Sequence, residues 1–174
     1  MSDLDEFRKE KDEFFRTDHD SPLAHEQTHH FAGLNYFPEN PDLVVVSEME
    51  PPAETGEVTM ETSTGASQVY ERAGVIPFTV DGQPTQVTLF RAKGDDALFL
   101  PFRDALSGKE TYGAGRYLDV APPHNGHVMV DFNYAFNPSC AYNPKYSCPL
   151  PPTENWLKVP IRAGEKNFSE GVDH

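Results

Sequence analysis

The stretch of sequence that decides the fold is residues 75–92, which read VIPFTVDGQPTQVTLFRA. Two runs rich in β-branched and aromatic residues flank Asp81-Gly82, and this dipeptide supplies the positive φ angles that a tight hairpin turn requires. The first run, residues 75–80, is expected to reach the turn, and the chain then returns through residues 86–90. The pattern therefore predicts an antiparallel hairpin at the centre of the fold.

The two-residue period of this hairpin extends outward over most of the chain that follows Leu43, broken by turn signals about every 8–12 residues. It predicts strands near residues 43–49, 57–63, 67–73, 75–80, 86–92, 97–102, 116–120, 127–136 and 156–161. No segment leaves room for a helical crossover, so parallel α/β folds are excluded. The expected fold class is mainly β: a single antiparallel β-barrel or closed sandwich with N-terminal helices packed on it.

The N-terminal segment carries helix signals instead. Ser2 can cap a helix over residues 2–16 with Asp5 as the capping-box acid, and Ser21-Pro22 starts a second, short helix that Gly33 can end. A length of 174 residues suits one domain. The single domain 1–174 is expected to comprise a helical N-terminal segment (1–40), a β domain (43–164) and a tail (165–174).

The charge of the chain limits its partners. There are 28 acidic against 14 basic residues, a formal charge of −14, and residues 1–65 hold 16 of the acids against four bases. Such a surface repels phosphate backbones and anionic membranes, so we expect neither nucleic acid nor membrane as a partner. The acidic N-terminus and the lack of a long apolar run predict a cytoplasmic protein. Halophilic adaptation and ordinary acidity both account for the charge.

Residues 121–152 are expected to form an ordered but irregular loop. They include seven prolines, which remove ladder donors and fix φ. Five aromatic residues between 132 and 146 carry more apolar surface than a solvated loop would hold. The loop is therefore predicted to fold back on the β domain.

The predicted strand that starts at His127 has two different faces. Alternation places apolar and aromatic side chains on one face and Asp131, Asn133 and Asn137 on the other. Short Asp and Asn side chains are poor strand formers and need a specific reason to be there. They line a polar pocket, or they bond the backbone of the following loop in Asx-type structures; the residues leave both interpretations open.

Arg116 is expected to lie next to this polar face. It opens a strand that is predicted to be the hairpin neighbour of the Asp131 strand, so that the two side chains can meet as a structural ion pair or hold an anionic ligand. Glu154 and Asn155 return towards the same end of the β domain. The candidate ligand-binding residues are Arg116, Asp131, Asn133, Asn137, Tyr142, Glu154 and Asn155.

Four blocks of the sequence carry a resemblance to a known family. They are FLPFRD (99–104), GKETYGAGRYL (108–118), DFNYAFNPSCAY (131–142) and YSCPLPPTEN (146–155). Together these blocks resemble the family catalogued as domain of unknown function 1684, which occurs in bacteria and halophilic archaea. The resemblance implies a soluble domain and supplies no catalytic residues.

Two sets of residues are alternative zinc ligands, although no cofactor is predicted. His25-Glu26-Gln27-Thr28-His29 spells the HExxH pattern, in which two histidines one helical turn apart hold zinc and the glutamate activates water. The polar Gln27 and Thr28 and the short helix favour a solvated histidine cluster instead. Cys140 and Cys148 lie in the proline-rich loop as buried thiols, as a disulfide, or as zinc ligands with His124 or His127.

Three functional hypotheses follow from the sequence. The first is a β-barrel protein that binds a small polar or anionic ligand in a polar pocket under the proline-rich loop. The second is a zinc-dependent hydrolase that uses His25, Glu26 and His29. The third is a non-catalytic interaction module whose acidic N-terminal helices bind a basic partner. The sequence predicts neither a specific reaction nor an oligomeric state.

Overall fold

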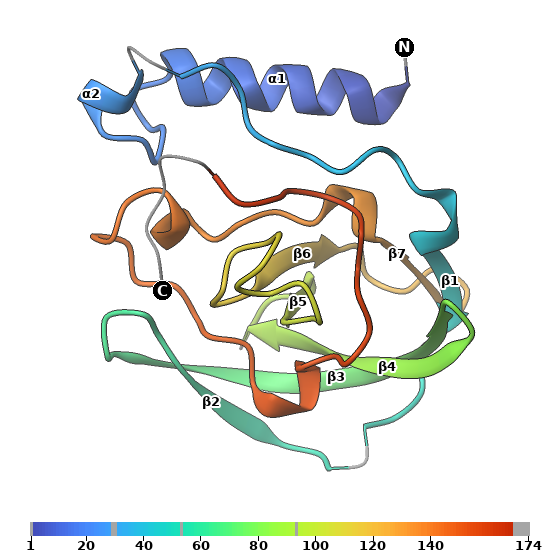
Figure 1. Cartoon of the computed structure of the whole chain (residues 1–174). Coiled ribbons are helices and arrows are strands. Elements are labelled where there is room, and N and C mark those ends of the chain that lie inside the picture. Colours follow the sequence, from blue (N-terminus) through green and yellow to red (C-terminus); the bar gives the residue numbers. More distant parts are fainter. Residues whose placement is uncertain (1, 29–30, 53, 93, 169–174) are drawn as a thin grey trace.

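The central hairpin forms as the sequence predicts. In the computed structural model, which describes residues 2–28, 31–52, 54–92 and 94–168, strand β3 (Ser67–Val80) pairs antiparallel with β4 (Gln83–Ala92). The turn residues Asp81 and Gly82 have φ angles of 49° and 80°, as a type I′ turn requires. The hairpin occupies the middle of the main sheet (Figure 1).

The strands form two antiparallel sheets. The larger one has the order β2-β3-β4-β5-β6 and adds β2 (Glu57–Glu61), β5 (Leu98–Phe102) and β6 (Arg116–Val120) to the hairpin. The smaller one pairs β1 (Val44–Glu48) with β7 (His127–Asp131). The mainly β class is thus confirmed. The strand pairings of the described residues close no barrel, so the finer prediction of a barrel or closed sandwich is not confirmed.

Strand β3 is longer than expected because it continues through Gly74. The two strands predicted on either side of this glycine form one strand with a bulge between Arg72 and Gly74. A Cβ atom at Gly74 would lie 2.3 Å from Met49 Cγ. The missing side chain lets the segment after β1 cross β3, where Glu50 and Val75 exchange backbone hydrogen bonds of 2.9 and 2.8 Å.

Two further predicted strands are corrected. Strand β7 ends at Asp131, and the chain turns into the 3-10 helix η2 (Phe132–Tyr134) instead of remaining extended to residue 136. Residues 156–161 form no strand apart from a bridge at Trp156. The alternating apolar side chains of this segment are nevertheless buried, namely Leu157, Val159 and Ile161. The two-residue period there reflects burial against the sheet rather than a ladder.

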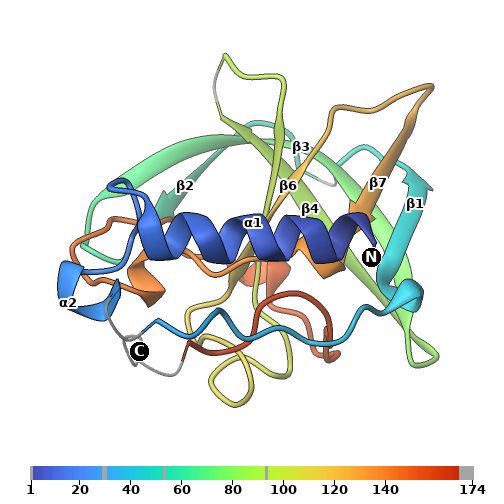
Figure 2. The same ribbon diagram turned by 90° about the horizontal axis from the view of Figure 1, so that it is seen from above.

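Helix α1 (Asp3–Thr17) confirms the predicted N-terminal helix. The Ser2 hydroxyl accepts a hydrogen bond from the Asp5 N–H, and the Asp5 carboxylate accepts one from the Ser2 N–H, both at 3.1 Å. These bonds lower the pKa of Asp5. Leu4 and Phe15 are the buried residues of the helix. Figures 1 and 2 show α1 lying across the side of the molecule opposite to β2 and β3.

The segment after α1 differs from the prediction. Ser21 accepts a hydrogen bond from the Leu23 N–H (3.2 Å) and donates one to the Phe15 carbonyl (2.8 Å), so it stabilises a turn rather than starting a helix. The short helix α2 begins later (His25–Thr28). The remaining 3-10 helices are η1 (Pro41–Leu43), η3 (Ser139–Ala141) and η4 (Thr153–Asn155). Among the described helices, none combines the length and apolar character that a membrane span needs.

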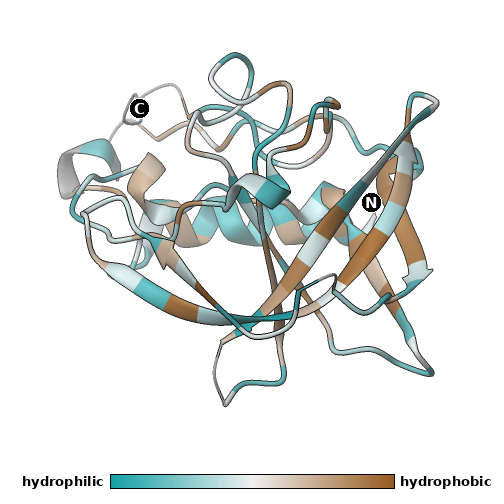
Figure 3. Ribbon diagram, turned by 90° about the horizontal axis from the view of Figure 1, so that it is seen from below, coloured by the Kyte–Doolittle hydropathy of each residue, from teal (hydrophilic) through white to brown (hydrophobic). Residues whose placement is uncertain are grey.

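The core lies between the two sheets, the η2 turn and the C-terminal segment 157–163. Figure 3 shows hydrophobic segments alternating with paler ones along the strands. The main cluster is formed by apolar residues of all these parts, including Ile76, Val87, Leu89, Leu100, Phe102, Val130, Phe132 and Ile161. Burying this apolar area supplies the main stabilising free energy. A second cluster around Phe15 and Tyr142 attaches α1 to the β domain.

Candidate functional site

Arg116, the first residue of β6, lies in the interior with 1 % of its side chain exposed. Its guanidinium donates to the carbonyl oxygens of Ile161 (2.8 Å), Ala163 and Glu165 (3.1 Å), and it pairs with Asp104 at 3.3 Å. Burial lowers the pKa of Arg116, while the charges of Asp104 and Glu165 oppose that shift. Arg116 therefore fastens the C-terminal segment to the sheet.

A second polar group is centred on Glu165, where the sequence placed the start of the tail. This side chain is 2 % exposed; it pairs with Lys11 of α1 and accepts a hydrogen bond from the Tyr142 hydroxyl. Burial, and then the charge of Glu165, raises the pKa of Tyr142 well above its ordinary value. Asn137 donates to the Lys166 carbonyl at 3.0 Å. The group joins α1, the proline-rich loop and the C-terminal segment.

Asp131 and Asn133 form a structural link to the N-terminal segment. Asn133 accepts a hydrogen bond from the Asn40 N–H (2.8 Å) and donates to the Asn40 carbonyl (3.0 Å). Asp131 accepts from both the backbone and the side-chain nitrogen of Asn133, at 3.0 and 2.9 Å. These are bonds of the Asx type, one of the two roles that the sequence left open. The expected meeting of Asp131 with Arg116 is wrong, because Arg116 pairs with Asp104.

Asn155 replaces part of a strand ladder. β4 and β5 are in register at Phe90 and Phe99, and beyond that point the buried Asn155 amide spans the gap. Its oxygen accepts from the Thr88 N–H (2.8 Å), and its nitrogen donates to the carbonyls of Thr88 (2.8 Å) and Pro101 (2.9 Å). The polar atoms of Asn155 are thus engaged within the sheet.

Glu154 lies at the surface, paired with Arg72. The guanidinium contacts both carboxylate oxygens at 2.8 to 3.2 Å, and this hydrogen bonding raises the pKa of Arg72. The seven predicted ligand-binding residues therefore fall into separate groups. Arg116, Asn137 and Tyr142 meet around Glu165, Asp131 bonds Asn133, which in turn bonds Asn40, and Glu154 and Asn155 lie at η4.

The two cysteines are free, buried thiols in one apolar cluster. Hydrogen bonding with Cys148 lowers the pKa of Cys140 to about 7 and raises the pKa of Cys148. The Tyr112 hydroxyl lies 3.5 Å from the Cys140 sulfur. Hydrogen bonds between Ser63 and Cys148, at 3.0 and 3.2 Å, tie the loop to the end of β2.

The predicted zinc motif falls largely where the structure gives no description. His29 lies outside the described residues, and the side chains of His25 and Glu26 are likewise outside the description. Within the described part of the chain, Asp18, His19 and Asp20 form the cluster of three metal-type ligands, exposed on the turn after α1. The hydrolase hypothesis therefore stays a prediction, as does the interaction module.

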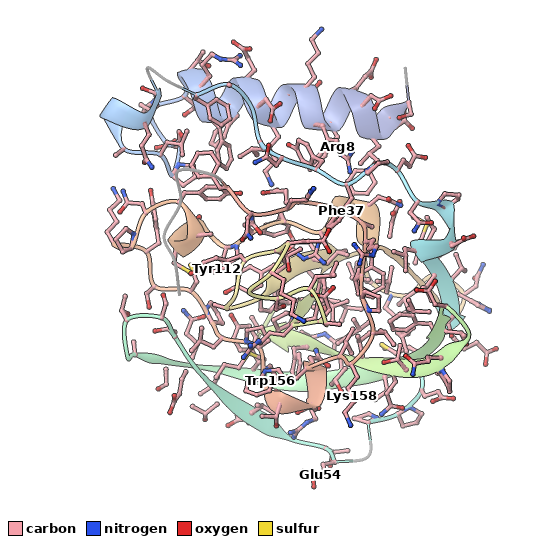
Figure 4. All side chains as sticks on the ribbon, in the orientation of Figure 1. Arg8, Phe37, Glu54, Tyr112, Trp156 and Lys158 are labelled. Carbon is pink, nitrogen blue, oxygen red and sulfur yellow. The ribbon has the colours of Figure 1, made fainter. Side chains whose placement is uncertain are left out.

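A pocket that the sequence did not predict opens beneath the end of the proline-rich loop. It has a volume of about 390 Å³ and is lined by Ser63, Arg103, Gly113, Ala114, Leu150, Pro151 and Trp156; we call it the Arg103–Trp156 pocket. Trp156 is 49 % exposed, and Figure 4 shows it on the lower side of the molecule, away from Arg8 and Phe37 near α1. Trp156, and with it the pocket, therefore lies away from α1.

Its two principal side chains are held in fixed positions. The Arg103 guanidinium lies 4.5 Å from the centre of the Trp156 ring, within the range of a cation–π contact. The indole N–H donates to the Pro151 carbonyl at 2.9 Å. The backbone of Arg103 donates to Asn155 (3.0 Å) and accepts from Leu157 (2.7 Å) on either side of Trp156. The Arg103–Trp156 pair is therefore held by backbone hydrogen bonds as well as by the cation–π contact.

The close approach of the next loop fixes the back of the pocket. Gly115 has a φ angle of +109°, and a Cβ atom there would lie 2.6 Å from the Phe102 carbonyl and 2.9 Å from Pro151 Cγ. Glycine is the residue that tolerates both the positive φ and this contact. The loop containing Gly113 and Ala114 can thus pack directly behind the Arg103 stem.

The polar groups of the pocket differ in one respect. The Ser63 hydroxyl donates to the Tyr146 carbonyl (3.0 Å) and accepts from the Cys148 N–H (3.2 Å), so its bonding is taken up. Within the described residues, the Arg103 side chain makes no hydrogen bond or ion pair besides its contact with Trp156. Arg103 therefore presents free N–H donors beside an apolar hollow.

Comparison with known proteins identifies the family. The model of the family described as "Protein of unknown function (DUF1684)" matches residues 29–166. The chain belongs to the DUF1684 family. The solution NMR structure of an uncharacterized protein of Haloarcula marismortui is similar to it, with 37% sequence identity and a TM-score of 0.72 over 94% of this chain and 91% of that one. No curated protein matches the chain significantly.

This DUF1684 chain also shows which signals the sequence offered for the pocket. Arg103, Gly113, Ala114 and Pro151 lie in blocks that carried the family resemblance, and Trp156 follows the last block directly. These residue types are typical of strand ends and turns. Nothing in their spacing along the chain indicates that they meet in one pocket. The single tryptophan of the chain was the available signal, because an indole placed among prolines and charged residues is rarely part of a core.

Proposed function

We propose that this DUF1684 protein binds a small ligand in the Arg103–Trp156 pocket, beneath the proline-rich loop. The observation that carries the proposal is an exposed, fixed indole beside a hollow of about 390 Å³ whose walls are apolar except for Arg103 and Ser63. Binding sites for small molecules are concave and largely apolar, with a few placed polar groups. In this acidic chain, the Arg103 guanidinium has no carboxylate partner among the described residues.

Preorganisation supports the proposal. The indole is held by Pro151, the Arg103 backbone is held on both sides, and Asn155 fixes the same segment to β4 and β5. A ligand that enters such a site does not have to order the side chains that it contacts.

The test uses the fact that the chain has a single tryptophan. In a ¹H–¹⁵N NMR spectrum its indole N–H gives one resolved signal, which reports on the pocket. A panel of small aromatic and aliphatic compounds, charged and neutral, is titrated into the protein. We expect saturable shifts of this signal with at least one compound class.

A pocket-filling variant separates binding in the pocket from binding elsewhere. Ala114→Phe places a ring among the lining residues and should abolish the shifts, whereas Ala97→Phe adds the same ring at an exposed turn outside the pocket and should retain them. The proposal fails if no compound saturates the signal, or if both variants behave alike.

A further inference from the structure

The chemistry of Arg103 indicates what the pocket holds. A guanidinium stacked on a ring uses its π face and leaves its N–H groups pointing outward in its own plane. Several other arginines of this protein direct such groups at carboxylates, among them Arg72 at Glu154, Arg116 at Asp104 and Arg162 at Glu110. Arg103 directs none of its donors at a described residue, although the chain holds twice as many acids as bases.

The charge around the pocket sets the charge of its occupant. Arg103 is the one charged residue in the described lining. A single guanidinium balances one negative charge, so the described lining matches a monoanion. The planar fork of N–H donors matches the two oxygens of a carboxylate.

The remaining walls set the shape of the occupant. Trp156, Leu150 and Pro151 offer apolar surface next to the guanidinium. The pocket volume of about 390 Å³ fits a molecule of modest size. Flat apolar groups pack against an indole and a proline ring with favourable contact. An apolar body thus fits beside the position of the carboxylate.

We propose that the ligand is a small organic carboxylate, a monoanion with a flat apolar body; this inference rests on the proposed function. Arg103 binds the carboxylate through its N–H fork, and Trp156 contacts the apolar body. Asn155 acts as a positioning residue, because it holds the segment that carries Trp156 and pairs with the backbone of Arg103.

Matched probes test the charge requirement. Phenylacetate and its neutral isostere phenylacetamide are titrated while the Trp156 indole signal is followed, with phenyl phosphate as a dianion of the same apolar body. We expect phenylacetate to bind at least about tenfold more tightly than phenylacetamide, since a charge-assisted hydrogen bond is that much stronger than a neutral one. Phenyl phosphate should bind no more tightly than phenylacetate.

Variants of Arg103 test which group reads the charge. Arg103→Gln should weaken phenylacetate binding about tenfold and leave phenylacetamide unchanged, and Arg103→Lys should give an intermediate loss because it keeps the charge without the fork. Arg162→Gln removes an equal charge from an exposed pair with Glu110, outside the pocket, and should alter neither probe. A melting temperature close to that of the native protein verifies that each variant is folded.

The outcomes separate the two proposals. If phenylacetamide binds as tightly as phenylacetate, the pocket binds ligands but the carboxylate inference is wrong. The same inference is overturned if phenyl phosphate binds about tenfold more tightly than phenylacetate, or if Arg162→Gln weakens phenylacetate as much as Arg103→Gln. If none of the three probes saturates the indole signal while another compound of the panel does, the carboxylate inference is wrong and the proposed function stands; if no compound of the panel saturates it, both fail.

Discussion

Two arginines of this protein have opposite surroundings. Arg116 is buried and directs its donors at three carbonyl oxygens and one carboxylate. Arg103 lies at the rim of a pocket, stacked on an exposed indole, with no hydrogen-bond acceptor among the described residues. The two stand at the ends of neighbouring strands, since Arg103 directly follows β5 and Arg116 is the first residue of β6.

The difference teaches how to weigh a polar residue as a functional candidate. A buried polar group must be satisfied by the protein, and losing a partner costs stability. A half-exposed group with free donors contributes little to folding and remains available to a ligand. Variants should therefore divide into those that change the free energy of unfolding and those that change binding.

The largest effect is expected at the Arg116 ion pair. Asp104→Ala leaves a buried guanidinium without its counter-charge and removes the acceptor of the Ile161 N–H (2.6 Å). We expect the free energy of unfolding to fall by about 3–5 kcal/mol, measured by urea denaturation. The control Glu110→Ala breaks the exposed pair with Arg162 and should cost less than about 1 kcal/mol. Equal losses of unfolding free energy in both variants would show that burial does not distinguish the Asp104 pair from the Glu110 pair.

The next largest effect is expected where the two regions are connected. Asn155→Ala removes the three hydrogen bonds by which the Asn155 side chain links β4 to β5. At about 1 kcal/mol each, their loss should lower the free energy of unfolding by about 3 kcal/mol. Because Asn155 also holds the segment of Trp156, the indole N–H signal should shift in the native state. A variant with normal stability and an unmoved signal would contradict this role.

A smaller effect is expected at Glu165. Tyr142→Phe keeps the ring in its cluster and removes the hydroxyl that donates to the carboxylate, which should cost about 1–2 kcal/mol. A double-mutant cycle with Lys11→Met measures how strongly α1 and the proline-rich loop are coupled through Glu165. Additive losses would show that the two contacts are independent.

The smallest effect on stability is expected at Arg103. Arg103→Gln removes a cation–π contact at a half-exposed site, so the free energy of unfolding should change by less than about 1 kcal/mol. The variant should unfold in urea with the slope of the native protein. A loss as large as that of Asp104→Ala would place Arg103 with the structural arginines.

The fold was predictable from local sequence where turn chemistry and period agree. Asp81-Gly82 indicated the hairpin, and the Ser2 and Asp5 capping box indicated α1. The failures have a physical cause in long-range contacts. Gly74 looked like a break between strands, yet it marks where the chain after β1 crosses β3. The segment at 156–161 has the period of a strand but meets side chains instead of a partner strand.

The site was harder to predict because polar residues in the sequence do not reveal their partners. The short polar side chains of Asp131 and Asn133 indicate a specific role, but Asn40, the partner of Asn133, lies far away in the chain. Arg116 stands out in the sequence, but three of its four acceptors are backbone carbonyls, which carry no side-chain signal. Arg103 and Trp156 meet through a bridge that no spacing rule indicates.

The bonds of Arg116 also have a consequence for synthesis. Its carbonyl acceptors lie between residues 161 and 165, which the ribosome adds after all the strands. Until those residues emerge, most of the hydrogen-bond acceptors of Arg116 are missing, and the desolvation of its guanidinium opposes burial of that side chain. We therefore expect the nascent chain to complete its core late, and a product terminated before residue 161 to stay open to proteases. Arg116 would in this way couple completion of the core to the synthesis of the C-terminal segment.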